Sequence, residues 1–95
     1  MEQRESALDL GELRDEIDKA DQMILSSFIA RMRVVRKIAE YKKENGMAVL
    51  DPKREKEKIE EIRRISPDDM EDSCVMLYNK IMEISRDLQT KEISE

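Results

Sequence analysis

The sequence predicts an all-α protein with three helices per chain, one of them very long, in an intertwined helical homodimer. Of its 95 residues, 43% are charged and 3% aromatic, with only two glycines and two prolines, a balance that favours long solvated helices. Apolar residues recur at helical spacing, and strand-like alternation is absent. No internal repeat divides the chain, so we expect one domain over residues 1–95.

The first helix is predicted from Leu13 to Asn45, because nothing between them breaks the helical pattern. Gly11 lies before it, and Gly46 stands where a C-terminal cap belongs. At about 1.5 Å per residue this helix is roughly 50 Å long, whereas a compact domain of this size has a radius of gyration of about 12 Å. A second copy of the chain would cover the excess length, which predicts the dimer. An extended coiled-coil rod stays open as the alternative.

The second helix is predicted to follow Asp51, whose side chain can cap a helix. Pro52 then occupies the first helical position, where its missing N–H costs nothing. Ile59 and Ile62 lie about one turn apart on its apolar face, and the helix is expected to end near Ile65.

The third helix is expected to begin in the same way, with Ser66 and Pro67 repeating the pair of capping residue and proline. Its apolar residues recur on one face. It is expected to fray in the polar tail near Lys91. The predicted face consists of Met70, Cys74, Leu77, Tyr78, Ile81 and Leu88.

Two cations stand on the apolar stripe of the first helix, where periodicity predicts the core. The stripe consists of Ile17, Ile24, Phe28, Val35 and Ile38. Arg31 and Lys42 share it and are eleven residues apart, which is about three turns. Glu55, on the buried face of the second helix, cannot neutralise both. A ligand with two carboxylates would balance the site, although an internal polar network of these side chains with Gln89 stays open.

Composition excludes several classes of function. A net charge of −5 argues against nucleic acid as a partner. With one cysteine and no histidine, neither a disulfide framework nor a conventional metal site is expected, and a reducing compartment fits. No apolar run approaches the roughly 20 residues that span a membrane. We therefore expect a soluble, cytoplasmic protein whose site works by fixed charges and hydrogen-bond donors.

Five motifs together carry a family resemblance. The first three are the arginine of LRDEI, a segment that begins at residue 13, an arginine in the middle of the first helix, and a lysine eleven residues later. The other two are D-x-x-R-E at the start of the second helix and S-x-x-x-Q late in the third. Over most of its length the chain resembles the all-helical chorismate mutases of the AroQ class. The resemblance implies the Claisen rearrangement of chorismate to prephenate in phenylalanine and tyrosine biosynthesis, without cofactor, metal or covalent intermediate.

The resemblance also implies roles for individual residues. Arg31 and Lys42 would bind the carboxylates of the substrate. Lys42 and Gln89 would donate to the ether oxygen whose bond breaks. Glu55, with the backbone at Asp51, would bind the ring hydroxyl.

Three further residues complete the expected substrate-binding set. Arg54 and Ser85 would support the hydroxyl and carboxylate ends of the substrate. Arg14 lies seventeen residues from Arg31, roughly 25 Å along a helix, so it cannot serve the same pocket within one chain. The resemblance implies that Arg14 enters from the other subunit of the homodimer, whereas spacing alone would leave it as a surface arginine.

Two alternative functions stay open. An isochorismate pyruvate-lyase would use a similar cationic pocket to eliminate pyruvate, but the presence of both Asp51 and Glu55 favours the mutase. A non-catalytic helical regulatory module would not require Arg14, Arg31 and Lys42 jointly. Activity of the isolated chain on chorismate separates these possibilities.

Overall fold

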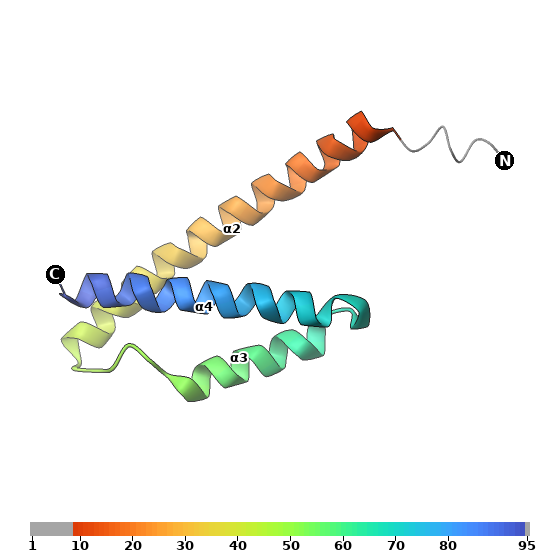
Figure 1. Ribbon diagram of the computed structural model, residues 1–95. Coiled ribbons are helices and arrows are strands. Elements are labelled where there is room, and N and C mark those ends of the chain that lie inside the picture. Colours follow the sequence, from red (N-terminus) through yellow and green to blue (C-terminus); the bar gives the residue numbers. More distant parts are fainter. Residues whose placement is uncertain (1–8, 95) are drawn as a thin grey trace. The chain divides into compact units, whose positions relative to one another are not determined.

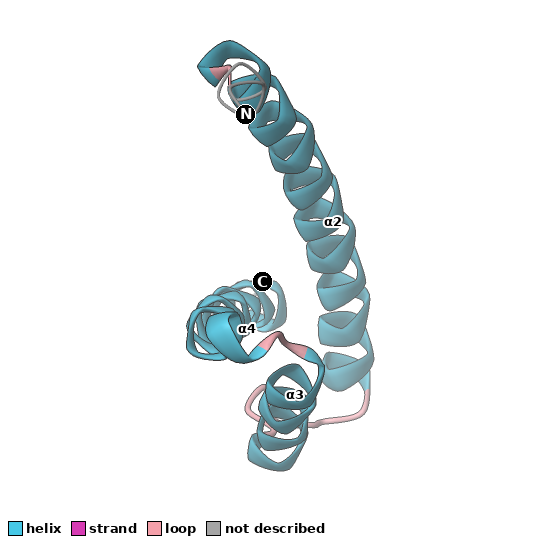
Figure 2. Ribbon diagram, turned by 90° about the vertical axis from the view of Figure 1, so that its right-hand side faces the viewer, coloured by secondary structure: helices cyan, strands magenta, loops and turns pink. Residues whose placement is uncertain are grey.

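The computed structural model describes residues 9–94, which are almost entirely helical (Figure 1). Along the chain lie α2 (Leu10–Glu44), α3 (Pro52–Ile65), the short 3₁₀ helix η1 (Asp68–Met70) and α4 (Glu71–Ser94). Figure 2 shows these described helices with loops between them and no strand, which confirms the all-α prediction. The chain divides between Arg31 and Met32 into two compact units.

Helix α2 begins earlier than predicted. Its first residue is Leu10, so Gly11 lies in the first turn and not before the helix. Asp9 is the reason: its side chain accepts a hydrogen bond from the Gly11 N–H at 3.1 Å, and its carbonyl accepts from the Leu13 N–H at 3.0 Å. This is the usual geometry of a capping aspartate, which compensates for the low helix propensity of the glycine.

The other end of α2 confirms the predicted glycine cap. The helix ends at Glu44, and Gly46 has a positive φ of 62°, which glycine adopts without strain. Met47 donates its N–H to the Lys42 carbonyl at 2.8 Å, and Gly46 donates to the Lys43 carbonyl at 3.4 Å. These two bonds form a Schellman motif, which reverses the chain after the helix.

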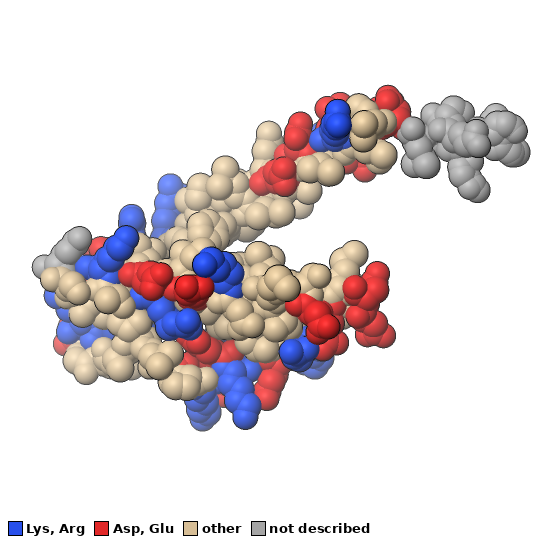
Figure 3. Space-filling view, in the orientation of Figure 1, with Lys and Arg blue, Asp and Glu red and all other residues tan. Residues whose placement is uncertain are grey.

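The first unit contains the N-terminal part of α2, and its apolar side chains are largely exposed. Ile17 is 59% exposed and Ile24 is 63% exposed, so one chain alone does not bury this part of the predicted stripe. Residues 22–30 carry no charged side chain, and Figure 3 shows an uncharged surface along this part of α2. In the second unit, the same stripe contributes the buried Val35 and the exposed Ile38.

Helix α3 confirms the predicted start and end. The Asp51 carboxylate accepts from the Arg54 N–H at 3.1 Å, and Pro52 occupies the first position. The helix ends at Ile65, after which Ser66 donates both its N–H and its hydroxyl to the Ile62 carbonyl. Ser66 therefore caps the end of α3, and the prediction that it starts the third helix is wrong.

Helix α4 is preceded by the 3₁₀ turn, in which Met70 donates its N–H to the Pro67 carbonyl at 2.9 Å. It continues through Ser94, beyond the predicted fraying near Lys91. Its buried face is also rotated from the predicted one by about one residue, or roughly 100° around the axis. The buried residues are Val75, Met82, Ser85 and Gln89, whereas Met70 and Leu77 of the predicted face are exposed.

The second unit has a small core that contains residues from all three long helices. Val35 and Ala39 of α2 are buried, as are Ile62 of α3 and Val75 and Met82 of α4. None of the helices within residues 9–94 is both long and apolar enough to cross a membrane.

The end of α3 is tied to the start of α4 by an ion pair outside this core. Arg63 donates to the Glu71 carboxylate at 2.9 Å. Hydrogen bonding to Glu71, helped by its charge, raises the pKa of Arg63.

Candidate active site

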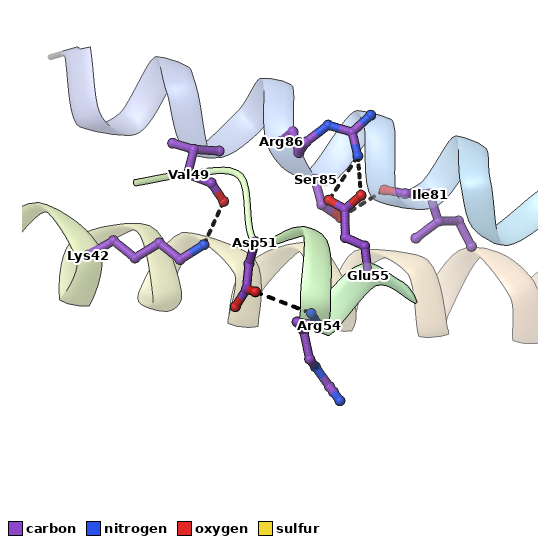
Figure 4. Close-up of polar contacts among 8 residues, drawn as sticks. All are labelled: Lys42, Val49, Asp51, Arg54, Glu55, Ile81, Ser85 and Arg86. Atoms are coloured by element: carbon purple, nitrogen blue, oxygen red, sulfur yellow. Dashed lines mark hydrogen bonds and ion pairs between the residues drawn. The ribbon is translucent and has the colours of Figure 1, made fainter. Parts of the chain in front are cut away.

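Lys42 is the cation around which the polar groups of the second unit gather. It lies in the last turn of α2 and is half-buried. Its Nζ donates to Gln89 Oε1 at 2.9 Å and to the Val49 carbonyl at 2.8 Å (Figure 4 draws the second bond). Both acceptors are neutral, so they satisfy two of the three ammonium N–H groups without cancelling the charge. A half-buried cation in this state favours an anionic ligand.

The cap of α2 explains why Val49 reaches this lysine. The carbonyl of Lys42 is one of the two acceptors in the Schellman motif, so the chain turns back directly after the helix. The loop that follows then brings the Val49 carbonyl to the ammonium group of the same lysine. The backbone and the side chain of Lys42 are thus both held by this one segment.

Gln89 supplies the polar partner from α4. It is 8% exposed, and its side-chain oxygen accepts from Lys42. Because the oxygen of the amide is occupied by the ammonium group, its two N–H donors remain for another acceptor. The pair can therefore offer adjacent donors to a single oxygen atom of a ligand.

Glu55 pairs with an arginine that the sequence analysis did not identify. Arg86 of α4 places Nη1 at 2.6 Å and 2.8 Å from the two carboxylate oxygens of Glu55, in the first turn of α3 (Figure 4). The side chains of Arg86 and Glu55 are 34% and 26% exposed. Hydrogen bonding to Glu55, with the attraction of its charge, raises the pKa of Arg86. Glu55 therefore has a partner of its own and does not neutralise Lys42.

Arg86 was not predicted as a site residue because it lies beside the predicted apolar face of the third helix and not on it. It follows Ser85 directly, about 100° around the helix from it, a position that periodicity assigns to the surface. One feature of the sequence could have indicated it. If Arg31 and Lys42 bind a ligand, the inward-facing carboxylate of Glu55 requires another cation as its partner.

Asp51 and Arg54 lie at the start of α3 and are both exposed. The carboxylate of Asp51 is occupied by the backbone N–H of Arg54. This leaves the guanidinium of Arg54 outside the cap, as Figure 4 shows. The cap fixes the first turn of α3, and Glu55 belongs to that same turn.

Ser85 is buried on α4, as expected for a polar group that faces inward. Its hydroxyl donates to the Ile81 carbonyl of the preceding turn at 2.8 Å and lies 3.9 Å from the sulfur of Met32. Bonding to the preceding turn satisfies a buried serine hydroxyl within its own helix.

The two remaining predicted residues lie in the first unit. Arg14 is exposed in the second turn of α2, and Arg31 is half-buried at the end of this unit. The roles assigned to them stay predictions. Among residues 9–94, no group of three acidic or thiol side chains could hold a metal ion.

Comparisons with known proteins bear on the family of this chain. The sequence profile of the family described as "Chorismate mutase type II" matches residues 13–90. A curated protein named "Chorismate mutase", from Methanocaldococcus jannaschii, is 28% identical over 88 residues, which cover 90% of this chain and 89% of that protein. No solved structure matches the chain. The family match confirms the resemblance drawn from the motifs and identifies the activity as that of a chorismate mutase, an isomerase. The chain belongs to the chorismate mutase type II family.

Proposed function

We propose that this chain converts chorismate to prephenate, on the route to phenylalanine and tyrosine, as a cytoplasmic homodimer that uses fixed charges and hydrogen-bond donors. The observation that carries the proposal is the state of Lys42. Its charge is half-buried, and among residues 9–94 the two acceptors bonded to it are neutral, one of them the buried amide of Gln89. Such a site is prepared for an anion without rearrangement.

The reaction requires neither a nucleophile nor a general base. The ether bond between the ring and the enolpyruvyl oxygen breaks while a carbon–carbon bond forms to the ring carbon that bears the carboxylate. The ether oxygen becomes a ketone oxygen, and no proton enters or leaves. Negative charge grows on this oxygen in the transition state, so donors aimed at it lower the barrier.

Lys42 and Gln89 are the proposed donors to the ether oxygen. They are bonded to each other at 2.9 Å, so each fixes the direction of the other before the substrate arrives. The positive charge of Lys42 also attracts a carboxylate of the substrate, which Arg31 helps to bind. Two cations on one helix match a dianionic substrate, and no cofactor is needed.

The other end of the substrate falls to residues of α3 and α4. Glu55 and the backbone at Asp51 bind the ring hydroxyl, because a carboxylate is a strong acceptor for an O–H donor. Arg54 supports the hydroxyl end, and Ser85 supports a carboxylate.

The dimer is proposed from the exposed apolar side chains of the first unit. Burying one large aliphatic side chain contributes about 1.5–3 kcal/mol, and Ile17 and Ile24 are each more than half exposed in one chain. A second copy that covers this part of α2 would bury the corresponding residues on both chains. In such an intertwined dimer, Arg14 of one chain completes the pocket of the other.

The test is product identification with chorismate and with isochorismate in parallel. We expect prephenate from chorismate and no pyruvate or salicylate from isochorismate. Release of pyruvate from isochorismate would instead assign the pyruvate-lyase reaction, and a folded dimer inactive on both would assign a non-catalytic regulatory module.

A matched pair of variants ties this activity to the proposed pocket. Arg31→Ala should lower kcat/KM for chorismate by at least about a hundredfold, because a preorganised charged contact is lost. Arg33→Ala removes an exposed arginine two residues along, on another side of α2, and should leave kcat/KM within about threefold of the wild type. Similar values for the two variants would remove Arg31 from the site.

A further inference from the structure

The pairing of Glu55 with Arg86 joins the first turn of α3 to α4 within the second unit. One nitrogen of the guanidinium lies against both oxygens of the carboxylate, at 2.6 Å and 2.8 Å. Both side chains are about two-thirds or more covered. Partial burial weakens the competition from water, so a charge-assisted contact of this kind holds the carboxylate in one orientation.

The contact leaves Glu55 able to bind a further donor. A carboxylate has about four acceptor positions, two on each oxygen. Nη1 of Arg86 uses one position on each oxygen and approaches both from the same side. Each oxygen therefore keeps a position for an O–H donor.

The location of Arg86 ties this contact to the rest of the candidate site. Arg86 lies three residues before Gln89 on α4, so the partner of Glu55 and the partner of Lys42 are carried by adjacent turns of one helix. Fixing Glu55 against α4 also fixes its distance from the Lys42 and Gln89 pair. A small substrate that touches both ends needs this distance to be constant.

We propose that Arg86 is a positioning residue, which holds the carboxylate of Glu55 oriented to accept the ring hydroxyl of chorismate. This inference rests on the proposed function, because it assigns Glu55 to that hydroxyl. Arg86 acts through Glu55 and does not touch the substrate. Its contribution therefore depends on the presence of both Glu55 and the hydroxyl.

The experiment is a double-mutant cycle measured with two substrates. Arg86→Met, Glu55→Gln and the double variant are assayed for kcat/KM on chorismate and on the analogue that lacks the ring hydroxyl. On chorismate, Arg86→Met should lose about tenfold, and the double variant should lose no more than Glu55→Gln alone. On the analogue, Arg86→Met should differ from the wild type by less than about threefold. Arg86→Lys, which keeps one charge at this position, should recover part of the activity on chorismate.

Arg63→Met is the matched control for a purely structural role. It breaks another arginine–carboxylate contact between α3 and the start of α4, in which Nη1 of Arg63 lies 2.9 Å from Oε2 of Glu71. This contact lies outside the candidate site. It should leave both substrates within about threefold of the wild type. Thermal melting of each variant gives the folded fraction, and rates are compared per folded dimer.

Two results would overturn the inference. Equal losses on chorismate and on the analogue, or losses that multiply in the double variant, would mean that Arg86 acts on the substrate directly. A lower melting temperature with unchanged kcat/KM on chorismate would mean that Arg86 only joins two helices. Either result leaves the proposed function standing, whereas a wild-type protein inactive on chorismate would remove the function itself.

Discussion

The two units of this chain differ in whether side chains on predicted inward faces find partners within the same chain. In residues 32–94, polar side chains placed on inward faces find partners within the same chain: Lys42 with Gln89 and Val49, and Glu55 with Arg86. In the described part of the first unit, residues 9–31, apolar side chains placed on an expected inward face remain exposed, as Ile17 and Ile24 show.

The difference shows that one chain can form these polar contacts by itself, whereas covering the apolar stripe requires a second surface. A polar contact needs only one correctly placed partner, and the turn after α2 or the adjacent α4 supplies it. An apolar stripe needs a continuous covering surface, and a single long helix cannot provide one for itself. The second unit therefore holds the contacts of Lys42 and Glu55. The first carries the surface that we assign to a second copy, together with Arg14 and Arg31, whose roles stay predictions.

The largest expected effect comes from placing a charge on the exposed stripe of the first unit. Ile24→Glu should abolish the dimer, because a carboxylate buried without a partner costs several kcal/mol. Activity should fall with it, since Arg14 then no longer reaches a pocket. Light scattering gives the mass, and the chorismate assay gives the activity.

Gln22→Glu is the matched control for this variant. It adds the same charge two residues away, about 200° around the helix. It should keep both the dimer mass and the activity. A dimeric and active Ile24→Glu protein would contradict the claim that a second copy covers the apolar stripe of the first unit.

The next effect links the units through exchange of subunits. Arg14→Ala and Lys42→Ala proteins should each be nearly inactive alone. Unfolded and refolded together, they form heterodimers in which one of the two pockets has both an intact Lys42 and an intact Arg14 from the other chain. We expect activity to reappear on mixing, measured as chorismate consumption per mole of dimer.

The control for this exchange is each variant refolded by itself, which should stay inactive. Mixed dimers demonstrated by mass spectrometry but without activity would show that Arg14 does not cross between subunits.

The smallest effect concerns a contact that only shapes the second unit. Asp51→Ala removes the cap of α3 and should destabilise the protein by about 1 kcal/mol, which lowers the melting temperature by roughly 4–8 °C for a domain of this size. Asp51→Asn keeps a capping oxygen and should melt close to the wild type. Because the proposed hydroxyl contact uses the backbone at Asp51, both variants should keep kcat/KM within about threefold once folded. A large loss of activity in Asp51→Asn would give the carboxylate a role in binding.

The sequence was sufficient for features that depend on local chemistry. Asp51 with Pro52 predicted the start of α3, and Gly46 predicted the end of α2. Ser66 misled because a serine followed by proline reads equally well as a helix start, and its actual bond to the preceding turn depends on where α3 stops.

Features that depend on contacts between elements were harder to predict. The buried face of α4 includes Ser85 and Gln89, and an analysis that counts only apolar residues shifts such a face toward its neighbours. Arg86 was missed because the partner of Glu55 is thirty-one residues away in sequence. The exposure of Ile24 could not be predicted from periodicity, which reports that a residue is apolar but not which chain covers it.

The most direct test of the whole account is the ratio of kcat/KM for chorismate between Lys42→Met and Lys43→Met. The two variants remove the same charge and the same donors from adjacent residues, one bonded to Gln89 and Val49 and the other exposed. We predict that Lys42→Met is slower by at least about a hundredfold at unchanged dimer mass and helix content. Values for the two variants within about threefold of each other would contradict the claim that a half-buried cation with neutral partners performs this reaction.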